Sequence, residues 1–397
     1  MSQDVYQKSL ILHRQRKGKL GTIALAPVHG QEDLSLLYTP GVAEPCRAIA
    51  ADVEESFHLT CRGRTVAVIS DGSAVLGLGN IGAAASLPVM EGKALLLKEF
   101  AGVDAVPIAI DTQEPQEIIK FVRQIAPSFV GINLEDISAP RCFEVEAALQ
   151  DLGITVFHDD QHGTAIVVTA ALHNAARVVK KKFEDLRVVV VGAGAAGLSI
   201  ANMLLGLELT SNGCQPVSNM PKVADLILVD SKGAICEGRG DLDPYKTCLA
   251  QHSNHKQLRG SLAEVIKGVD VVIGVSRAGT ISTEMVRSMA PQAIVFAMAN
   301  PEPEIMPELA RKAGAAVVAT GRSDFDNQIN NVLAFPGVFR AVVDGRLPRI
   351  TTQMKQAAAQ AIASLVPNPT INKIIPAPFD QGVVEAVSQA ILQSQSS

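Results

Sequence analysis

Two pairs of adjacent carboxylates stand at the ends of two apolar, β-branched segments of the sequence. The segment FVGINLED ends in Glu135 and Asp136, and the segment ITVFHDD ends in Asp159 and Asp160. The carboxyl ends of neighbouring parallel strands meet at one edge of a sheet, so four acidic side chains are expected in one crevice. Their mutual repulsion disfavours the ionised forms unless a cation balances it. Oxygen ligands favour Mg²⁺ or Mn²⁺ over zinc, and the sequence therefore predicts a divalent metal site.

A second interpretation of these acids needs no metal. Asp136 and Asp159 stand just before two helical segments and can act as N-caps of those helices. The occurrence of two acidic pairs after consecutive strands favours the metal site. His158 and His162 are expected beside the site rather than as ligands, because hard cations prefer oxygen.

One lysine, Lys93, lies on the apolar face of a predicted helix. In LPVMEGKALLLKEF, the residues Val89, Leu96 and Phe100 share the face that carries Lys93. Partial removal from water next to a cation would lower the pKa of this lysine, which could then act as a base near neutral pH. A lysine that extends its ammonium to an acid is the alternative. Tyr38, in the turn of LLYTPGVAEPC, is either a functional loop residue or a buried packing residue.

A glycine-rich turn follows the apolar segment RVVVV and is followed at once by a helical segment. Glycines let the backbone approach a pyrophosphate, and the free N–H groups at the start of the helix bind the anion. The residues predicted to form this dinucleotide site are Gly192, Gly194, Ala195, Ala196 and Gly197. A second match to this glycine pattern occurs at Gly77, Gly79 and Gly82. Several residues separate it from its strand, so tight packing of a helix is favoured there over dinucleotide binding.

The choice between NAD and NADP depends on the residues at the end of the next strand. That strand ends in Asp230, whose carboxylate can accept hydrogen bonds from the ribose hydroxyls of NAD. Ser231 and Lys232 come next and can instead bind the 2′-phosphate of NADP. The sequence is therefore compatible with either NAD or NADP.

Apolar strand-like segments alternate with helical segments along the chain. The predicted strands are RTVAVIS, AVPIAID, FVGINLE and ITVFHD, followed by RVVVVG, ADLILVD, VDVVIGVS, AIVFAMAN and AAVVATG. Continuous β-branched strands of this kind are typical of parallel sheets covered on both faces by helices. We therefore predict an α/β protein with an N-terminal α/β substrate and metal domain over residues 1–162. A Rossmann-like doubly wound NAD(P)-binding domain with C-terminal helices is predicted over residues 163–397.

Three further elements are expected within this frame. A long helix over Thr164–Lys182 joins the two domains. The segment 210–222 is rich in turn formers and is expected to be a surface loop. After Ile350, two helices are expected on either side of a Pro-rich segment.

The composition limits the classes of function. The 397 residues are 47% hydrophobic and 19% charged, which is typical of a soluble globular protein with two domains of ordinary size. A net charge of −5 and an aromatic content of 4% without tryptophan argue against nucleic-acid binding, so small molecules are the expected partners. The scattered cysteines are expected to be reduced thiols. The sequence lacks an export signal and a membrane span, and a cytoplasmic location is expected.

With these features in place, the chain resembles the malic enzymes, in particular their short bacterial form. The resemblance covers nearly the whole sequence and rests on the ordered blocks YTPGVAEPC, SDGSAVLGLGNIG, LPVMEGKALL, GINLEDISAPRCFEVE, FHDDQHGTA, VVVVGAGAAG, LVDSKG, FAMANPEPEI and RSDFDNQINNVLAFPGVFRA. It implies oxidative decarboxylation of malate to pyruvate and CO₂, with reduction of NAD⁺ or NADP⁺ and a requirement for Mg²⁺ or Mn²⁺. Decarboxylation of oxaloacetate and assembly into a homodimer or a higher homo-oligomer are implied as well.

The resemblance also assigns roles to individual residues. The implied metal ligands are Glu135, Asp136 and Asp160. The implied catalytic residues are the base Lys93, the neighbouring acid Asp159, and Tyr38 as the acid that protonates the enol. The asparagines that would hold substrate and nicotinamide are Asn300 and Asn330.

Two departures from the family pattern limit what the resemblance implies. Ala74 stands in DGSAVLG where larger members have an arginine that binds a substrate carboxylate. The residue that binds this carboxylate is therefore not assigned. Because the sequence ends near Ser397, the phosphotransacetylase-like domain of some bacterial relatives is not expected here.

Other functions are compatible with parts of the sequence. Within the family, malate can be converted to lactate without net reduction of the coenzyme. A metal-free amino-acid or folate dehydrogenase also combines a lysine with a following Rossmann unit, but it leaves the acidic pairs unexplained. A non-catalytic dinucleotide-binding regulator is the remaining alternative.

Overall fold

The computed structural model describes residues 3–75, 77–210 and 213–395, which form a parallel sheet, a second sheet that is parallel except for its edge strand β9, and a short hairpin. The first sheet has the strand order β2-β1-β3-β4 and consists of β1 Thr65–Ser70, β2 Asp104–Ala109, β3 Gly131–Leu134 and β4 Thr155–His158. The second has the order β12-β11-β10-β5-β8-β9 and consists of β5 Arg187–Val191, β8 Asp225–Asp230, β9 Gly233–Ala234, β10 Val271–Gly274, β11 Ala293–Ala297 and β12 Ala315–Thr320. All strands predicted from the sequence are present, and the predicted α/β class is confirmed.

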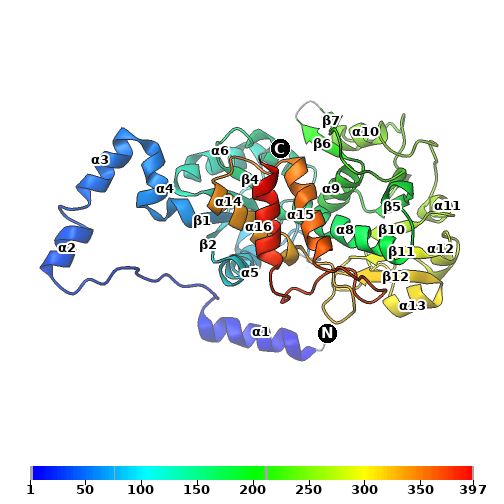
Figure 1. Ribbon diagram of the computed structural model, residues 1–397, viewed down its shortest axis with the longest axis horizontal. Helices are drawn as coiled ribbons and strands as arrows, with labels where there is room; N and C mark the ends of the chain where they lie inside the picture. The colour runs from blue at the N-terminus through cyan, green and yellow to red at the C-terminus, as the bar shows by residue number, and fades with distance from the viewer. Residues whose placement is uncertain (1–2, 76, 211–212, 396–397) are drawn as a thin grey trace.

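Helices pack around both sheets (Figure 1). The N-terminal ones are α1 Gln3–Arg16, α2 Gln31–Leu37, α3 Ala43–Ala51, α4 Ser56–Leu59, α5 Ala83–Ala101, α6 Pro115–Ile125 and α7 Arg141–Ala148. The later ones are α8 Asp159–Val178, α9 Ala195–Leu204, α10 Pro244–Ala250, α11 Leu262–Val265, α12 Thr283–Arg287, α13 Pro307–Lys312, α14 Phe335–Gly345, α15 Thr352–Ser364 and α16 Val383–Ser394. The two helices expected after Ile350 are thus present as α15 and α16.

Each sheet contains a point at which the order of its strands reverses. In the first sheet this point lies between β1 and β3, and in the second it lies between β5 and β10. Loops that leave the carboxyl ends of the strands at such a point form a crevice in which ligands bind. The loop after β3 begins with Glu135 and Asp136, and the loop after β5 begins with Gly192.

The helix α8 connects the two sheets and is deeply buried. It begins at Asp159 and ends at Val178, so it starts and finishes several residues earlier than predicted. The acids of the HDD sequence therefore lie in the first turn of a helix rather than on a strand. The domain boundary at residue 162 falls inside this helix and stays a prediction.

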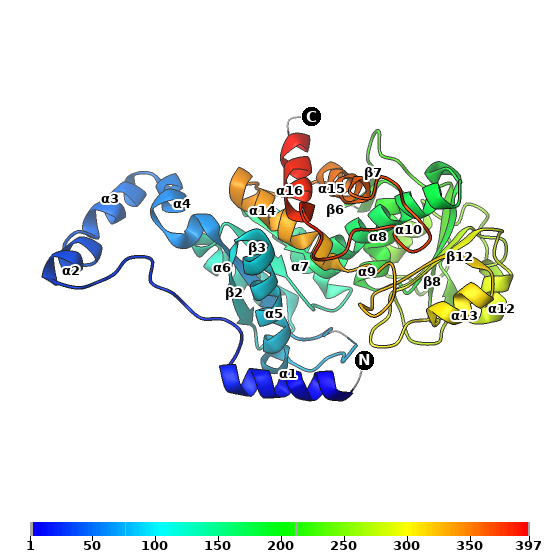
Figure 2. The ribbon, with the colours of Figure 1, turned by 60° about the horizontal axis from the view of Figure 1, so that its bottom comes forward.

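The C-terminal helices return to the first domain. Figure 2 shows α14 beside α5 and α16 packed against α14. The hydroxyl of Thr155 in β4 donates to the carbonyl oxygen of Leu347 at 2.7 Å. A Cβ at Gly131 in β3 would lie 3.1 Å from Val342 of α14. The segment that follows the second sheet thus covers one face of the first.

One local expectation was wrong in part and another was wrong. Within the segment 210–222 expected as a loop, Thr210 and Gly213–Pro216 belong to a hairpin, in which β6 Leu207–Thr210 pairs with β7 Gly213–Pro216. Residues 217–222 form a turn and coil as expected, while residues 211 and 212 lie outside the described residues. Cys214 and Cys248 form a disulfide, so they are not the reduced thiols that the sequence predicted. The remaining cysteines are free.

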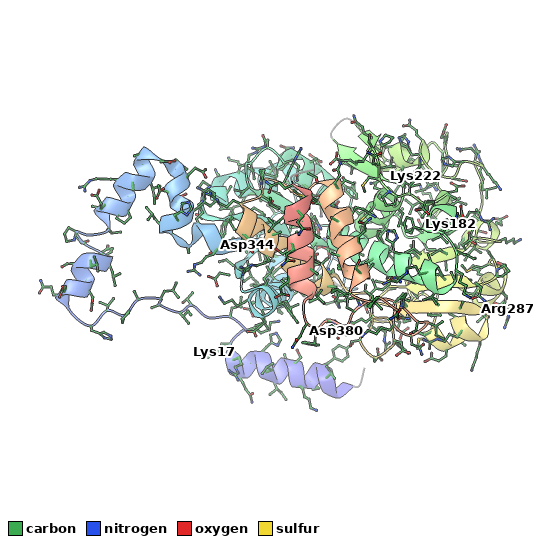
Figure 3. The ribbon with its side chains drawn as sticks, viewed as in Figure 1. Lys17, Lys182, Lys222, Arg287, Asp344 and Asp380 are labelled. Atoms are coloured by element: carbon green, nitrogen blue, oxygen red, sulfur yellow. A yellow bond between two sulfur atoms is a disulfide. The ribbon has the colours of Figure 1, made fainter. Side chains whose placement is uncertain are left out.

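The first helices form an arm that extends from the body of the molecule. In Figures 1 and 2, α2 and α3 lie apart from both sheets, and Figure 3 shows Lys17 near the point where the arm leaves α1. Large apolar side chains of the arm are exposed, among them Ile23, Leu25, Val28, Leu36 and Tyr38. Elsewhere, labelled charged residues such as Lys182, Arg287 and Asp344 lie on the periphery (Figure 3). Within the described part of the chain, every helix is too short or too polar to cross a membrane.

Candidate active site

Three carboxylates converge where the first sheet meets α8. Glu135 and Asp136 directly follow β3, and Asp160 lies in the first turn of α8. One oxygen of each of these side chains lies within 4.8 Å of the others. Glu135 and Asp136 are buried, whereas 33% of the Asp160 side chain is exposed. Because all donors are oxygens, the cluster fits Mg²⁺ or Mn²⁺.

The backbone brings these acids together. Asp136 has a φ of 55°, a left-handed conformation that aspartate and asparagine adopt more readily than other non-glycine residues. Its N–H donates to Asp160 Oδ2 at 2.7 Å and ties the loop after β3 to the start of α8. The capping interpretation is wrong, because the N-caps of α7 and α8 are Pro140 and His158, and neither cap uses a side-chain hydrogen bond.

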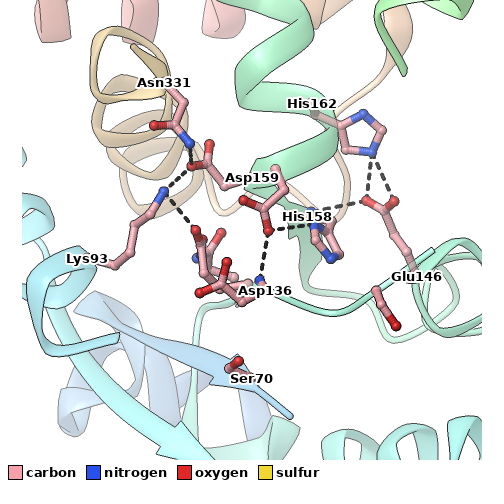
Figure 4. Close-up of polar contacts among 12 residues, drawn as sticks. Ser70, Lys93, Asp136, Glu146, His158, Asp159, His162 and Asn331 are labelled. Atoms are coloured by element: carbon pink, nitrogen blue, oxygen red, sulfur yellow. Dashed lines mark hydrogen bonds and ion pairs between the residues drawn. The ribbon is translucent and has the colours of Figure 1, made fainter. Parts of the chain in front are cut away.

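Lys93 reaches this cluster from α5 (Figure 4). Its ammonium forms ion pairs with Asp159 and with Glu135, the latter at 3.0 Å. The ammonium also lies over the ring of Phe335, 4.3 Å from the ring centroid. Only 11% of the Lys93 side chain is exposed, so its burial is confirmed, and its ammonium pairs with acids as the alternative interpretation expected.

The neighbouring acids decide the charge state of Lys93. Burial by itself lowers the pKa of Lys93, but attraction from Asp159, Glu135 and Asp160 outweighs burial and raises the pKa above its ordinary value. Burial also raises the pKa of Glu135 well above its ordinary value, and repulsion from Asp160 adds to this against the opposing influence of Lys93. The protein groups alone therefore hold Lys93 charged. The lowered pKa expected from the sequence requires the positive charge of a cation at the carboxylates.

An asparagine that sequence reasoning missed contacts Asp159. The carboxamide of Asn331 donates to Asp159 Oδ2, the oxygen that also pairs with Lys93. Asn330, which the sequence predicted for the substrate site, instead accepts a hydrogen bond from the N–H of Val332 at 2.9 Å. Asn330 thereby caps the short 3₁₀ turn Asn331–Leu333. No local signal in the motif QINN distinguishes the two asparagines, because the path of the chain after the turn decides which one faces Asp159.

Gly163, one turn after Asp159 in α8, makes room for this carboxylate. A Cβ at Gly163 would lie 1.8 Å from Asp159 Oδ1 and 3.3 Å from the Cβ of Asn331. Any side chain at this position would therefore move Asp159 away from Lys93. The glycine in HDDQHG is the sequence signal for this close approach.

Two histidines lie behind the carboxylates, as expected. His158 is fully buried, and its Nδ1 lies 3.7 Å from Asp160 Oδ2. His162 points away from Lys93 and bonds to Glu146 of α7 at 2.8 Å (Figure 4). Neither residue belongs to the cluster of three carboxylates.

Of the predicted catalytic residues, Tyr38 is the one that does not lie near Lys93 within a single chain. It directly follows α2 on the extended arm, and 68% of its surface is exposed. The helix α2 lies away from α5 in both views (Figures 1 and 2). Within a single chain, Tyr38 is therefore neither a packing residue nor a part of the Lys93 site.

The glycine turn of the second sheet has the conformation expected for a dinucleotide site. Gly192 has a φ of 113°, and Gly194 is the N-cap of α9, which begins at Ala195. A Cβ at Gly197 would lie 1.7 Å from the carbonyl oxygen of Gly192, so only glycine lets α9 start this close to β5. The N–H groups in the first turn of α9, which includes Ala195 and Ala196, form the place for an anion.

Asp230 ends β8 beside this turn. Its carboxylate pairs with Arg239 and accepts the N–H of Lys232 at 2.9 Å. Burial opposes ionisation of Asp230, but these hydrogen bonds outweigh burial and hold its pKa below the ordinary value. Ser231 is exposed. The Lys232 ammonium pairs with Asp241 at 2.8 Å.

A cleft of about 640 Å³ separates the loops of the two sheets. Its walls include Ala74 and Gly77 from the first domain and Arg277 and Asn300 from the second. A Cβ at Gly77 would lie 2.5 Å from the carbonyl oxygen of Asn300, so the second glycine motif allows close packing of two loops. Ala74 contributes no charge to this cleft, whereas the exposed Arg277 does.

Two family models match this chain and together span most of it. One, described as "Malic enzyme, N-terminal domain", matches residues 17–150. The other, described as "Malic enzyme, NAD binding domain", matches residues 161–391. These matches give no support to a metal-free amino-acid or folate dehydrogenase or to a non-catalytic regulator.

Individual relatives agree with the family models. The bifunctional malic/malolactic enzyme of Bacillus subtilis is 50% identical over 98% of this chain and 92% of that protein. The NAD-dependent malic enzyme of Geobacillus stearothermophilus is 53% identical over 95% of this chain and 76% of that protein. The crystal structure of the NAD-dependent malic enzyme of Thermotoga maritima has a TM-score of 0.90 at 46% identity, and the match covers 97% of this chain and 98% of that one.

Proposed function

Because this chain belongs to the malic enzyme family, we propose that it catalyses the oxidative decarboxylation of malate to pyruvate and CO₂ with reduction of NAD⁺ or NADP⁺. The observation that carries the proposal is the position of the Lys93 ammonium, which pairs with Glu135 at the edge of the three-carboxylate cluster. Incubation with malate, Mn²⁺ and either coenzyme tests it. Reduced nicotinamide and pyruvate should form in equal amounts, and oxaloacetate should also lose CO₂. Absence of both products would refute the proposal.

The chain's own residues can carry out the proton transfers. A divalent cation held by Glu135, Asp136 and Asp160 would supply Lewis acidity toward the C2 oxygen of malate. Carboxylates neutralised by such a cation would attract the Lys93 ammonium less, and the pKa of Lys93 would fall. Its amine can then accept the proton of the C2 hydroxyl while the C2 hydride passes to the nicotinamide. Asp159 and Phe335 hold the lysine in place from two sides.

We assign Tyr38 to the active site of a second copy of the chain. The proton that C3 of the enol requires has to come from an acid, and the resemblance assigns that role to Tyr38. The arm that carries it leaves the body of its own chain and exposes a series of apolar side chains, which a partner surface would cover. A homodimer in which each arm reaches the partner's Lys93 accounts for both features.

Mixing two inactive variants tests this arrangement. If arms are exchanged, a mixed dimer of Tyr38→Phe and Lys93→Met chains contains one site with both residues intact. Random reassortment makes about half of the dimers mixed, so roughly a quarter of wild-type activity should return after the two variants are unfolded and refolded together. No recovery, with mixed dimers present by native mass spectrometry, would place Tyr38 in its own chain's site or outside catalysis.

We propose NAD⁺ as the preferred coenzyme. The ionised Asp230 at the end of β8 would repel a 2′-phosphate and accept hydrogen bonds from the ribose hydroxyls. Replacement Asp230→Ala is expected to lower kcat/KM for NAD⁺ and raise it for NADP⁺, measured with both coenzymes side by side. Arg239→Ala is the discriminating control, because a selective loss of NADP⁺ activity in that variant would assign Arg239 to a 2′-phosphate and contradict the preference.

Asn331, rather than Asn330, is proposed to hold the substrate beside Lys93. Asn331→Ala is expected to raise KM for malate and lower kcat, because its carboxamide reaches the oxygen that pairs with Lys93. Asn330→Ala removes only a cap and is expected to cost about 1 kcal/mol of stability. Steady-state kinetics and thermal melts of both variants separate the roles. Impaired kinetics in Asn330→Ala, with only a loss of stability in Asn331→Ala, would instead assign Asn330 to the substrate site.

Conversion of malate to lactate is a second candidate activity. The relative from Bacillus subtilis that is 50% identical to this chain is named a bifunctional malic/malolactic enzyme. Retention of the reduced coenzyme in the active site until pyruvate is reduced would give this outcome. Chromatography of the products separates lactate from pyruvate. A cytoplasmic location stays a prediction.

A further inference from the structure

A cavity of about 480 Å³ lies on the other side of the start of α8 from Lys93. It is enclosed by α7, α8, α9, the β6–β7 hairpin, α10 and the start of α15. Figure 4 shows His162 and Glu146, which line this cavity, on the opposite side of α8 from Lys93. Its size falls in the range of small-molecule sites, and the catalytic roles proposed above use none of its residues.

One end of the cavity is polar and donates hydrogen bonds. The Lys355 ammonium lies 3.0 Å from His162 Nδ1, and His162 Nε2 lies 2.8 Å from Glu146. In this chain of contacts Lys355 donates to His162 and His162 donates to Glu146, so the imidazole carries its proton on Nε2. An ammonium has three N–H donors, and within the described residues Lys355 has no further hydrogen-bond acceptor. At least one donor of Lys355 is therefore open to a ligand.

Two buried carboxamides also line the cavity. Gln161 is 1% exposed and Asn202 is 9% exposed, and both belong to the cavity wall. Among the described residues, Gln161 Nε2 lacks an acceptor and Asn202 Oδ1 lacks a donor. Buried polar atoms of this kind are normally satisfied. A bound carboxylate would give Gln161 Nε2 its missing acceptor, whereas Asn202 Oδ1 needs a donor that a carboxylate does not have.

The acidic side chains that line the cavity already accept hydrogen bonds from protein groups. Glu146 accepts from His162 and from the N–H of His158, and Glu208 accepts from the hydroxyl of Thr352 at 3.3 Å. Arg349 adds a second cation at the exposed rim. The rest of the wall is apolar and includes Phe143, Phe157, Met203, Leu207 and Leu209.

We propose that this cavity is an effector site for a small carboxylate with an apolar body. The carboxylate accepts hydrogen bonds from Lys355, and the apolar body contacts the aromatic and aliphatic wall. The site is coupled to the proposed metal ligands, because Glu146 bonds both to His162 and to the N–H of His158, which directly precedes the turn carrying Asp159 and Asp160. A ligand on Lys355 thus acts on the start of α8 without entering the catalytic crevice.

Calorimetric titration with benzoate tests the proposal. The titration is done without malate, coenzyme or divalent cation, so that benzoate cannot bind to a metal ion in the catalytic crevice. Benzoate should bind in a saturable manner, whereas benzyl alcohol, of the same shape but neutral, and inorganic phosphate, which lacks an apolar body, should bind at least about tenfold more weakly.

Three variants locate the bound benzoate. Lys355→Met keeps the length of the side chain and removes its charge, so benzoate affinity should fall at least about tenfold. Ala147→Trp, at an exposed position on α7 at the cavity rim, should block entry while leaving the core unchanged. Lys312→Met, on the exposed surface of α13, is the matched control and should bind as the wild type does.

The outcomes separate this site from the proposed reaction. Equal benzoate affinity in wild type, Lys355→Met and Ala147→Trp would overturn the effector site, as would equal binding of benzyl alcohol. Because binding is measured without substrates, such a result leaves the malate oxidation assay unaffected. An inactive enzyme that still binds benzoate through Lys355 would instead refute only the proposed reaction.

Discussion

Replacement of Lys93 by methionine is expected to lower kcat for malate oxidation by roughly 10²- to 10⁴-fold, the usual contribution of a general base. Methionine keeps the length and apolar contacts of the side chain but cannot accept the hydroxyl proton. It also leaves Asp159 and Glu135 without their cation, so a fall in thermal stability is expected as well. The measurement is the initial rate of coenzyme reduction at saturating malate and Mn²⁺.

Two further variants separate chemistry from folding. Lys93→Arg keeps the positive charge but cannot be deprotonated at neutral pH, so it should recover stability without recovering activity. Lys98→Met changes a lysine on the same helix whose side chain is 52% exposed, and near-wild-type rates are expected from it. Near-normal turnover by Lys93→Arg would remove Lys93 from the role of base.

Replacement of Asp136 by asparagine is expected to weaken Mn²⁺ binding at least tenfold. Even changes to residues that only orient metal ligands cost roughly 10- to 100-fold in affinity, and this change removes a negative charge from the cluster itself. Asparagine tolerates the left-handed backbone of this position, whereas alanine would add strain. Free Mn²⁺ measured by electron paramagnetic resonance, together with the Mn²⁺ dependence of the rate, gives both affinities.

The control for this variant is Asp151→Asn. Asp151 belongs to the same domain, but its side chain is 69% exposed and pairs only with the surface residue Arg123 among the described ion pairs. Its replacement should leave the Mn²⁺ titration unchanged. An identical titration for wild type and Asp136→Asn would exclude Asp136 as a ligand.

Elements that depend on local pattern could be predicted from the sequence. The continuous β-branched segments became parallel strands, all of them largely buried except the edge strand β2. The acids that follow β3 and β4 converge because those strands are neighbours in the sheet. The turn also follows from local sequence, since Gly192 and Gly197 each meet a local steric need, whereas a Cβ at Gly194 would contact nothing within 4 Å.

Features that depend on distant contacts could not be predicted. Asn331 meets Asp159 across 172 positions of the chain, and nothing near Asn331 marks it over Asn330. The pKa of Lys93 depends on how many acids surround the ammonium, which the helix pattern does not contain. The hairpin of β6 and β7 has the composition of a loop, because its strands pair only with each other at the surface.

Crystals soaked in MnCl₂ and measured at a wavelength that gives anomalous scattering from manganese show directly whether the three carboxylates bind a metal ion. We expect one strong anomalous peak among the oxygens of Glu135, Asp136 and Asp160, next to Lys93, and its loss in crystals of Asp136→Asn. Carboxylates that remain apart with only water between them, or a peak elsewhere on the protein, would exclude a metal site beside Lys93.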